Sequence, residues 1–272
     1  MGYSNGMRPV EVHGHRGARA ARPENTLAGF AYAIAAGADW IELDLHVTRD
    51  DVLVVTHDPL LNPVICRGER PGVSTVVREL TLAEVREWDC GSLRHPRFPR
   101  QQPVPGARIP TLDEVLELGA SSGVRFNIEV KSFTRFPRYT PPPPAYATLV
   151  AEALRRHKLE ARAMVQSFDF RILAAMRTAA PEIALGALWE HGGEDFVSLA
   201  REAGARTVAP QHTLVTPAKV EAAQRKGIRI VPWTPNRRGN WERLLRAGVD
   251  GIITDDPAGL IAFLGERGLR TG

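Results

Sequence analysis

Short apolar runs alternate with amphipathic stretches along most of the chain. The runs are four to eight residues long and rich in β-branched residues, which is typical of buried strands. Predicted strands cover Val10–His15, Trp40–Val47, Val52–Thr56, Phe126–Val130, Ala163–Ser167, Ile183–Leu188, Thr207–Pro210, Ile228–Trp233 and Gly251–Thr254. Most stretches between them have helical spacing; Leu27, Phe30 and Ile34, for example, share one helix side. This alternation predicts a parallel sheet connected by helices.

Polar residues and glycines mark where the predicted helices begin and end. Capping-box spacing occurs in Thr81 with Glu84 and in Thr111 with Glu114, first-turn prolines follow cap residues in Thr216-Pro217 and Asp256-Pro257, and helix-ending glycines are Gly37, Gly204, Gly227 and Gly248. Eight strand–helix units result if Val52–Thr56 is an extra strand that continues the second one. The count therefore favours an α/β fold of the (β/α)8 TIM-barrel type over an open sheet. Nucleotide-binding glycine motifs do not follow the first strand.

Two segments interrupt the pattern. Residues 59–110 hold many of the prolines and glycines, and they predict one short helix near Leu82–Trp88. We interpret this segment as a small insertion over one mouth of the barrel, after the second strand region, within a single domain of residues 1–272. A second break, Phe133–Pro144, ends in four consecutive prolines, which should be stiff and extended.

Composition and charge change this picture little. The 272 residues carry a formal net charge of +4, and the cations are mostly scattered arginines, so we expect no nucleic-acid partner. The sequence has no stretch of membrane-spanning length, and Met1–Pro9 lacks the apolar core of a signal peptide. A cytoplasmic protein without a stable membrane anchor is therefore expected. Cys66 and Cys90 are the only thiols, and we expect them to be free rather than bridged. The sequence does not predict an oligomeric state.

A set of acids and histidines follows the predicted strands. Glu42 and Asp44 alternate along the second strand, so their side chains point to the same side, and Glu129 lies on the next parallel strand. Three neighbouring carboxylates in a low-dielectric site repel one another and need a cation to stay ionised. Oxygen ligands favour one divalent cation, Mg²⁺ or Ca²⁺, with Mn²⁺ possible. The alternative is that Glu42 and Asp44 pair with surface arginines.

Histidines and cations complete the set. His15 and His57 each end a predicted strand, and such a pair can supply both proton transfers of ester cleavage. Arg16 and Lys131 would hold phosphate oxygens. Trp233 ends the seventh barrel strand and is interpreted as an apolar wall of the substrate pocket, with a role in capping the barrel core as the alternative. The other histidines are interpreted as structural, with His13 facing the helices or loops.

These motifs together resemble the glycerophosphodiester phosphodiesterases. The matching pieces are His15-Arg16-Gly17, Pro23-Glu24-Asn25-Thr26, Glu42-Leu43-Asp44, His57-Asp58-Pro59, Ile109-Pro110-Thr111-Leu112, Glu129-Val130-Lys131, Gln166-Ser167-Phe168, Trp233-Thr234 and Asp250-Gly251-Ile252-Ile253-Thr254-Asp255. They span nearly the whole chain.

The resemblance implies a (β/α)8 barrel with a small insertion after His57-Asp58. It also implies a divalent metal on Glu42, Asp44 and Glu129, with His15 and His57 as the acid–base pair. The implied reaction is hydrolysis of a small-molecule glycerophosphodiester to an alcohol and sn-glycerol 3-phosphate. Two other hypotheses remain open: a lysophospholipase D-like enzyme that acts on lysophospholipids, and a non-catalytic phosphate-binding barrel.

Overall fold

The computed structural model describes residues 9–68, 74–133 and 135–270. Its strands are β1 (Glu11–Gly14), β2 (Trp40–Val47), β3 (Leu53–Val55), β4 (Arg125–Val130), β5 (Ala163–Ser167), β6 (Ala184–Trp189), β7 (Thr207–Pro210), β8 (Arg229–Ile230) and β9 (Gly251–Thr254). They pair side by side in the order β8-β7-β6-β5-β4-β2-β1-β9, and every pair along this path is parallel. β3 pairs antiparallel with β2, as expected for an extra strand that continues it.

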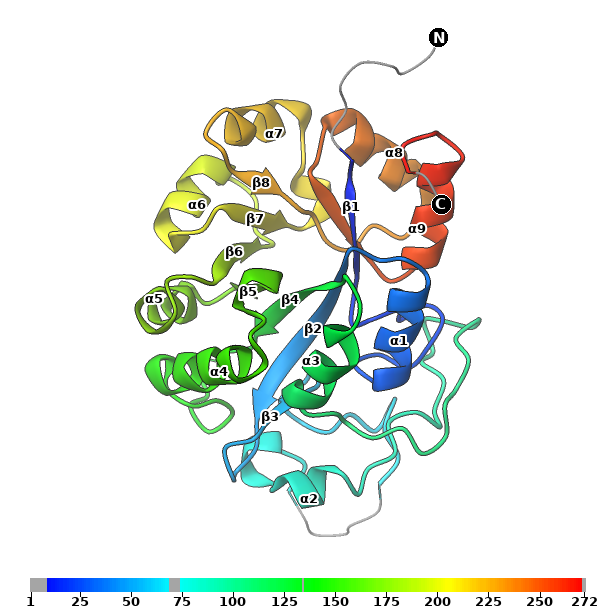
Figure 1. Ribbon diagram of the computed structural model, residues 1–272, viewed down its shortest axis with the longest axis vertical. Helices are drawn as coiled ribbons and strands as arrows, with labels where there is room; N and C mark the ends of the chain where they lie inside the picture. Colours follow the sequence, from blue (N-terminus) through cyan, green and yellow to red (C-terminus); the bar gives the residue numbers. More distant parts are fainter. Residues whose placement is uncertain (1–8, 69–73, 134, 271–272) are drawn as a thin grey trace.

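Two backbone hydrogen bonds bring the ends of this path together. Asp250 N donates to Ile230 O and Ile253 N donates to Pro232 O, each at 2.9 Å, so β9 lies beside the chain of β8. The eight parallel strands form a nearly closed barrel with the helices around it (Figure 1). The predicted (β/α)8 TIM-barrel fold is confirmed.

Several helices begin or end at the caps that the sequence predicts. They are α1 (Leu27–Ala35), α2 (Leu82–Val85), α3 (Leu112–Ala120), α4 (Pro143–His157), α5 (Phe170–Ala179), α6 (Phe196–Ala203), α7 (Pro217–Gln224), α8 (Arg238–Ala247) and α9 (Pro257–Gly265). Both predicted capping boxes form, at Thr81 and at Thr111. Gly204 and Gly248 end their helices in the left-handed conformation that glycine adopts without steric cost. One prediction is wrong in part: Pro143 and Pro144 form the first turn of α4, where a proline loses no intrahelical hydrogen bond.

The barrel interior at the amino ends of the strands is polar. Glu11 accepts hydrogen bonds from Trp40 Nε1 at 3.0 Å and Arg125 at 2.7 Å, and it pairs with Arg229. His13 stacks on Trp40, with 5.1 Å between ring centroids. The prediction that His13 faces the helices or loops is therefore wrong, because every second side chain of β1 points into the barrel and joins this ionic layer.

The segment between β3 and α3 has a small apolar core of its own. Val54, Leu61, Val77, Val85 and Ile109 are buried in it, with Cys66 and Cys90. These two cysteines form a disulfide, so the prediction of free thiols is wrong. Backbone hydrogen bonds between the neighbouring residues Arg67 and Asp89 draw the two chain segments together, a long-range pairing that cysteine spacing does not reveal. Figure 1 shows this segment, in cyan to green, below the barrel.

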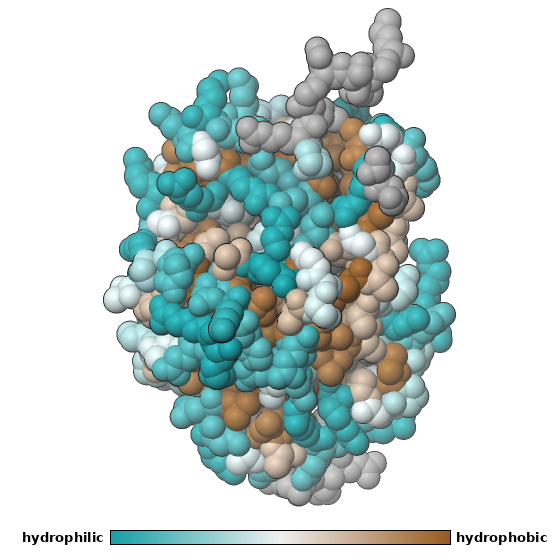
Figure 2. Space-filling model, in the orientation of Figure 1, coloured by the Kyte–Doolittle hydropathy of each residue, from teal (hydrophilic) through white to brown (hydrophobic). Residues whose placement is uncertain are grey.

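The surface agrees with the scattered charge of the sequence. Figure 2 shows hydrophilic residues over most of one face, with hydrophobic residues in separate groups between them. Among the described residues, no helix has both the length and the apolar character needed to cross a membrane. The segment 1–8, on which the expectation about a signal peptide mainly rests, lies outside the described residues.

Candidate active site

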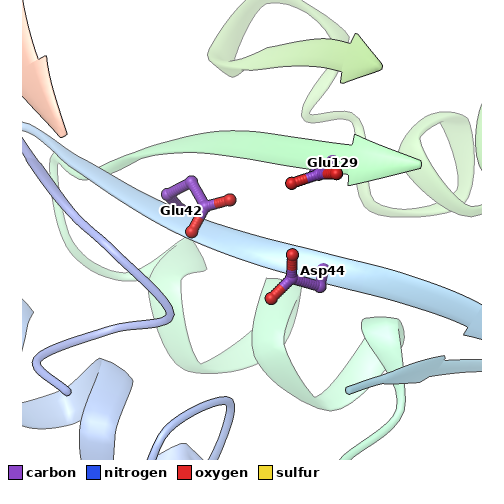
Figure 3. A group of neighbouring side chains, drawn as sticks. All are labelled: Glu42, Asp44 and Glu129. Carbon is purple, nitrogen blue, oxygen red and sulfur yellow. The ribbon is translucent and has the colours of Figure 1, made fainter. Parts of the chain in front are cut away.

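Three carboxylates from two adjacent strands meet near the carboxyl ends of β2 and β4. Asp44 is paired in register with Glu129, and Glu42 with Asn127, so alternate side chains of both strands point into the barrel. Ligand oxygens of Glu42, Asp44 and Glu129 all lie within 4.8 Å of one another. Figure 3 shows the three carboxylate groups converging between the two strands. The predicted convergence is present, and the surface-arginine alternative is wrong for this buried group.

Burial and mutual repulsion act against the negative charge of two of these groups. Burial raises the pKa of Glu42 well above its usual range, and the charges of Asp44 and Glu129 raise it further. Burial and the charge of Asp44 also raise the pKa of Glu129, although Lys131 acts in the opposite direction. A bound cation stabilises the ionised form of carboxyl groups that resist ionisation in this way. The donor set therefore fits a metal ion, and Glu42, Asp44 and Glu129 could hold one.

Asp44 has a different environment from the two glutamates. It is fully buried, and its oxygens lie 3.0 Å from Lys131 Nζ and 3.2 Å from Arg16 Nε. Asn25 donates a third contact at 2.8 Å. Burial alone would raise the pKa of Asp44, but the charges of Lys131 and Arg16 outweigh burial and hold it well below its usual range. The charge of Asp44 is thus balanced by Arg16 and Lys131, and Asp44 links these two cations to Glu42 and Glu129.

Two histidines each have a carboxylate on the same ring nitrogen. His15 Nδ1 lies 2.6 Å from Asp255 Oδ1, and His57 Nδ1 lies 2.7 Å from Asp58 Oδ1. A carboxylate on Nδ1 fixes the orientation and tautomer of the ring and leaves Nε2 for a second partner. Burial lowers the pKa of His15, and Asp255 only partly opposes this effect. The hydrogen bond with His57 lowers the pKa of Asp58 to about 2, so Asp58 is ionised at neutral pH.

The His15-Arg16-Gly17 turn depends on close backbone packing. Gly17 has φ +87°, and a Cβ there would lie 2.7 Å from the backbone carbon of Gly29, so another residue would not fit. Arg16 and Asn25 also have positive φ angles, of 51° and 53°. Strained conformations of this kind are held in place by their surroundings and concentrate at functional sites. Here Asn25 N donates to Arg16 O, and Arg16 N donates to Glu42.

The sequence-predicted residues line a common cavity of about 350 Å³. Its lining includes His15, Arg16, Glu42, His57, Glu129, Lys131 and Trp233. Asp44 is not in the lining, but it contacts two residues that are, Arg16 and Lys131. Trp233 packs against the small apolar group at the centre of the barrel, and Phe168 meets it edge-on with 5.6 Å between ring centroids. Trp233 therefore both covers the barrel core and forms a wall of the cavity.

Several residues of the site have no role in the sequence prediction. They are Glu24, Asn25, Gln166, Asn236 and Asp255, all within motifs or beside motifs that the sequence displays. Glu24 accepts from Arg16 at 2.7 Å and from Arg19 at 2.5 Å, and Asn236 donates to Asp255 at 2.6 Å. The signal was present in Pro-Glu-Asn-Thr and in the closing Thr254-Asp255. The partners are distant in the sequence, however, so only the fold reveals whom these residues contact.

A TIM barrel with acids, paired histidines and cations at the carboxyl ends of its strands defines an enzyme of phosphate-ester chemistry. The model of the glycerophosphoryl diester phosphodiesterase family matches residues 15–259. The chain belongs to this family, and it is a phosphodiesterase.

Individual relatives agree with this assignment. A glycerophosphodiester phosphodiesterase from Caldanaerobacter subterraneus subsp. tengcongensis is 35% identical over 257 residues, which cover 94% of this chain and 98% of the relative. A solved structure from Silicibacter pomeroyi, named provisionally for the same activity, superposes with a TM-score of 0.90 at 32% identity and covers 98% of this chain and 96% of its own. A phosphodiesterase from Oleispira antarctica, solved with sn-glycerol-3-phosphate, shares the fold with a TM-score of 0.79 at 22% identity, covering 94% of this chain and 96% of its own.

Proposed function

We propose that this protein hydrolyses glycerophosphodiesters to an alcohol and sn-glycerol 3-phosphate. One observation carries the proposal: two histidines, each held by a carboxylate, line the cavity that Glu42 and Glu129 also line. Such a pair can donate and accept the protons that ester cleavage requires. The name of the Caldanaerobacter relative and the product bound in the Oleispira structure support the same substrate class.

We further propose that Glu42, Asp44 and Glu129 hold one divalent cation. An all-oxygen donor set favours Mg²⁺ or Ca²⁺, with Mn²⁺ as a further candidate. A cation bound there would polarise the phosphoryl group.

The remaining roles follow from position and chemistry. His15 and His57 form the acid–base pair, with Nε2 of each ring available to the substrate because Nδ1 is engaged. Arg16 and Lys131 hold phosphate oxygens, Arg16 through its planar fork and Lys131 as a point charge. Trp233 forms the wall against which the glycerol or the alcohol packs. The substrate we expect is a small polar diester such as glycerophosphocholine or glycerophosphoethanolamine.

A metal-by-substrate panel tests the proposal. Purified protein is treated with chelator and assayed on glycerophosphocholine, glycerophosphoethanolamine and lysophosphatidylcholine, with Mg²⁺, Ca²⁺ or Mn²⁺ added back singly. We expect chelation to abolish hydrolysis, one of the three ions to restore it, and sn-glycerol 3-phosphate to be the phosphorylated product. Full activity in the chelated protein would contradict the metal role. Equal kcat/KM on glycerophosphocholine and on a dialkyl phosphate without hydroxyls would contradict the substrate class.

The alternative is a lysophospholipase D-like activity on lysophospholipids. Two observations favour it: Phe168, which lines the cavity beside Trp233, is 42% exposed, and a lysophospholipase D from Mus musculus is 25% identical over 283 residues. A higher kcat/KM on lysophosphatidylcholine than on glycerophosphocholine would establish this alternative in the same panel.

A further inference from the structure

A second cavity, of about 290 Å³, adjoins the one described above. The two cavities share His57, Glu129, Lys131 and Phe168, so they meet beside Glu129. A phosphodiester has two ester arms that leave one phosphorus atom. A phosphate placed at the shared wall can therefore extend one arm into each cavity.

The two cavities differ in charge. Besides the residues already assigned, the first is lined by Arg19, Arg97 and Glu190, and its arginines suit a phosphorylated polyol. The second is lined by the carboxylates of Asp58 and Asp169, and its aromatic residues are Phe133 and Phe168. Carboxylates beside aromatic rings suit a cation, because a ring face attracts positive charge.

Asp169 is well placed to attract a cation. It precedes α5 as its N-cap, and its side chain is 10% exposed. Ser132 Oγ donates to it at 2.6 Å and Arg171 pairs with it at 2.7 Å, although the Arg171 side chain is 56% exposed to solvent. Burial alone would raise the pKa of Asp169, but the hydrogen bonds from Arg171 and Ser132 lower it, so the carboxylate is ionised at neutral pH.

We propose that the second cavity binds the alcohol arm of the diester and selects a cationic, ammonium-bearing alcohol, with Asp169 as the specificity-determining residue. This inference rests on the proposed function, since it assigns one arm of the same substrate. The two aspartates of the second cavity have different roles. Asp58 holds His57, whereas the hydrogen bonds of Asp169 in the described chain include none to a histidine of the site.

Two substitutions should change the selectivity in opposite directions. Asp169→Asn removes the charge but keeps a residue that caps helices well, so α5 should persist. Arg171→Gln removes the cation that partly neutralises Asp169, so the cavity should attract an ammonium group more strongly. A merely structural role of this pair would not give opposite signs. Asp195→Asn is a matched control, because Asp195 is the N-cap of the neighbouring helix α6 and does not line either cavity.

The experiment compares glycerophosphocholine with its neutral isostere, the 3,3-dimethylbutyl ester of glycerol 3-phosphate. We expect the wild-type protein to prefer the choline ester about fivefold in kcat/KM, the scale of a partly exposed cation site. Asp169→Asn should bring this ratio close to one with little change on the neutral ester. Arg171→Gln should raise the ratio, and Asp195→Asn should leave it unchanged.

A wild-type ratio of one, or a ratio that Asp169→Asn leaves intact, would overturn the inference. If Asp169→Asn does not fold, Arg171→Gln decides: an unchanged or lower ratio counts against the role of Asp169. Failure of the proposed function looks different, because neither ester would then be hydrolysed with any of the three metals.

Discussion

Replacing Asp44 by asparagine should destabilise the chelated protein, whereas replacing Glu42 by glutamine should not. By sequence the two acids are alike: each belongs to a group of carboxylates that repel one another, so removing either charge should lower the stability of the protein little or should raise it. The contacts in the structure separate them. Glu42 accepts from the Arg16 backbone at 2.9 Å and lies 3.4 Å from Gln166. Asp44 instead contacts two cationic side chains, those of Arg16 and Lys131.

The magnitudes follow from these contacts. Asp44→Asn leaves Arg16 and Lys131 buried with less compensation, and breaking a buried ion pair from one side costs about 3 kcal/mol or more. At this chain length that loss corresponds to a decrease of roughly 6–12 °C in Tm. Glu42→Gln removes a charge that burial and its neighbours already disfavour, so the free energy of unfolding should stay constant or rise by up to about 1 kcal/mol.

The assay is chemical denaturation in chelator and again with the activating cation. In chelator, Asp44→Asn should be less stable than wild type and Glu42→Gln should not. With the cation at about 100 times its Kd, wild type should gain roughly 2.7 kcal/mol by mass action, and both variants should lose most of this gain. Asp195→Asn, at an exposed helix cap, controls for the general effect of an amide. If Asp44→Asn is as stable as Glu42→Gln in chelator, the compensation argument is wrong.

Three further predictions concern the disulfide, the ionic layer at the amino ends of the strands and the two histidines of the site. Replacing Cys66 and Cys90 by alanine should lower the stability of the insertion by about 3 kcal/mol, because the disulfide closes a loop between residues 24 positions apart. It should also speed proteolysis of the insertion. Glu11→Gln should lower the free energy of unfolding by roughly 1–2 kcal/mol at pH 7. His15→Ala and His57→Ala should each lower kcat by about 10²-fold or more while the protein stays folded.

Each of these predictions has its own control. Reductant should reproduce the disulfide effect in wild type and leave the alanine variant unchanged. The fold lowers the pKa of Glu11: burial alone would raise it, but the contacts with His13, 3.6 Å away, and with Arg229 outweigh burial. Its stabilisation is therefore present above the unfolded pKa, about 4.3, and is lost as pH falls. The difference between wild type and Glu11→Gln should shrink below pH about 4, and a constant difference would refute the ionic account. A p-nitrophenyl diester should rescue only the variant that lacks the general acid.

The fold was predictable because its signals are local. β2, β5, β7 and β9 have the predicted bounds, because the local composition of each segment favours a strand. The ionic layer at the amino ends of the strands was not predictable in the same way. Alternation along β1 shows that Glu11 and His13 share a side, but periodicity does not say which side is the interior.

The candidate site divides along the same line. Alternation along β2 and β4 suffices to bring the three carboxylates together. The partner of His15 was not predictable, because Asp255 is 240 residues away in the sequence and reaches the histidine only when β9 lies beside β1. The partner of Cys66 was missed for a related reason. Its pairing depends on backbone hydrogen bonds between Arg67 and Asp89, two exposed or half-buried positions without apolar periodicity.

The disulfide also connects to the chemistry of the site through the insertion. Gln101 donates to the backbone carbonyls of Arg19 and Arg22, at 2.8 and 3.1 Å, and His95 contacts Arg19 at 3.2 Å. The insertion thus supports the loop that presents Arg16. If the disulfide opens, this support weakens before the barrel itself is affected, so the loss should fall on substrate binding rather than on folding of the barrel. The cytoplasmic location expected from the sequence stays a prediction, and the disulfide offers a test of it because disulfides persist mainly in oxidising compartments. Thiol alkylation of protein from its native host, followed by mass analysis, would decide between a reducing and an oxidising compartment. Cysteines that react only after reduction would place the protein outside a reducing compartment.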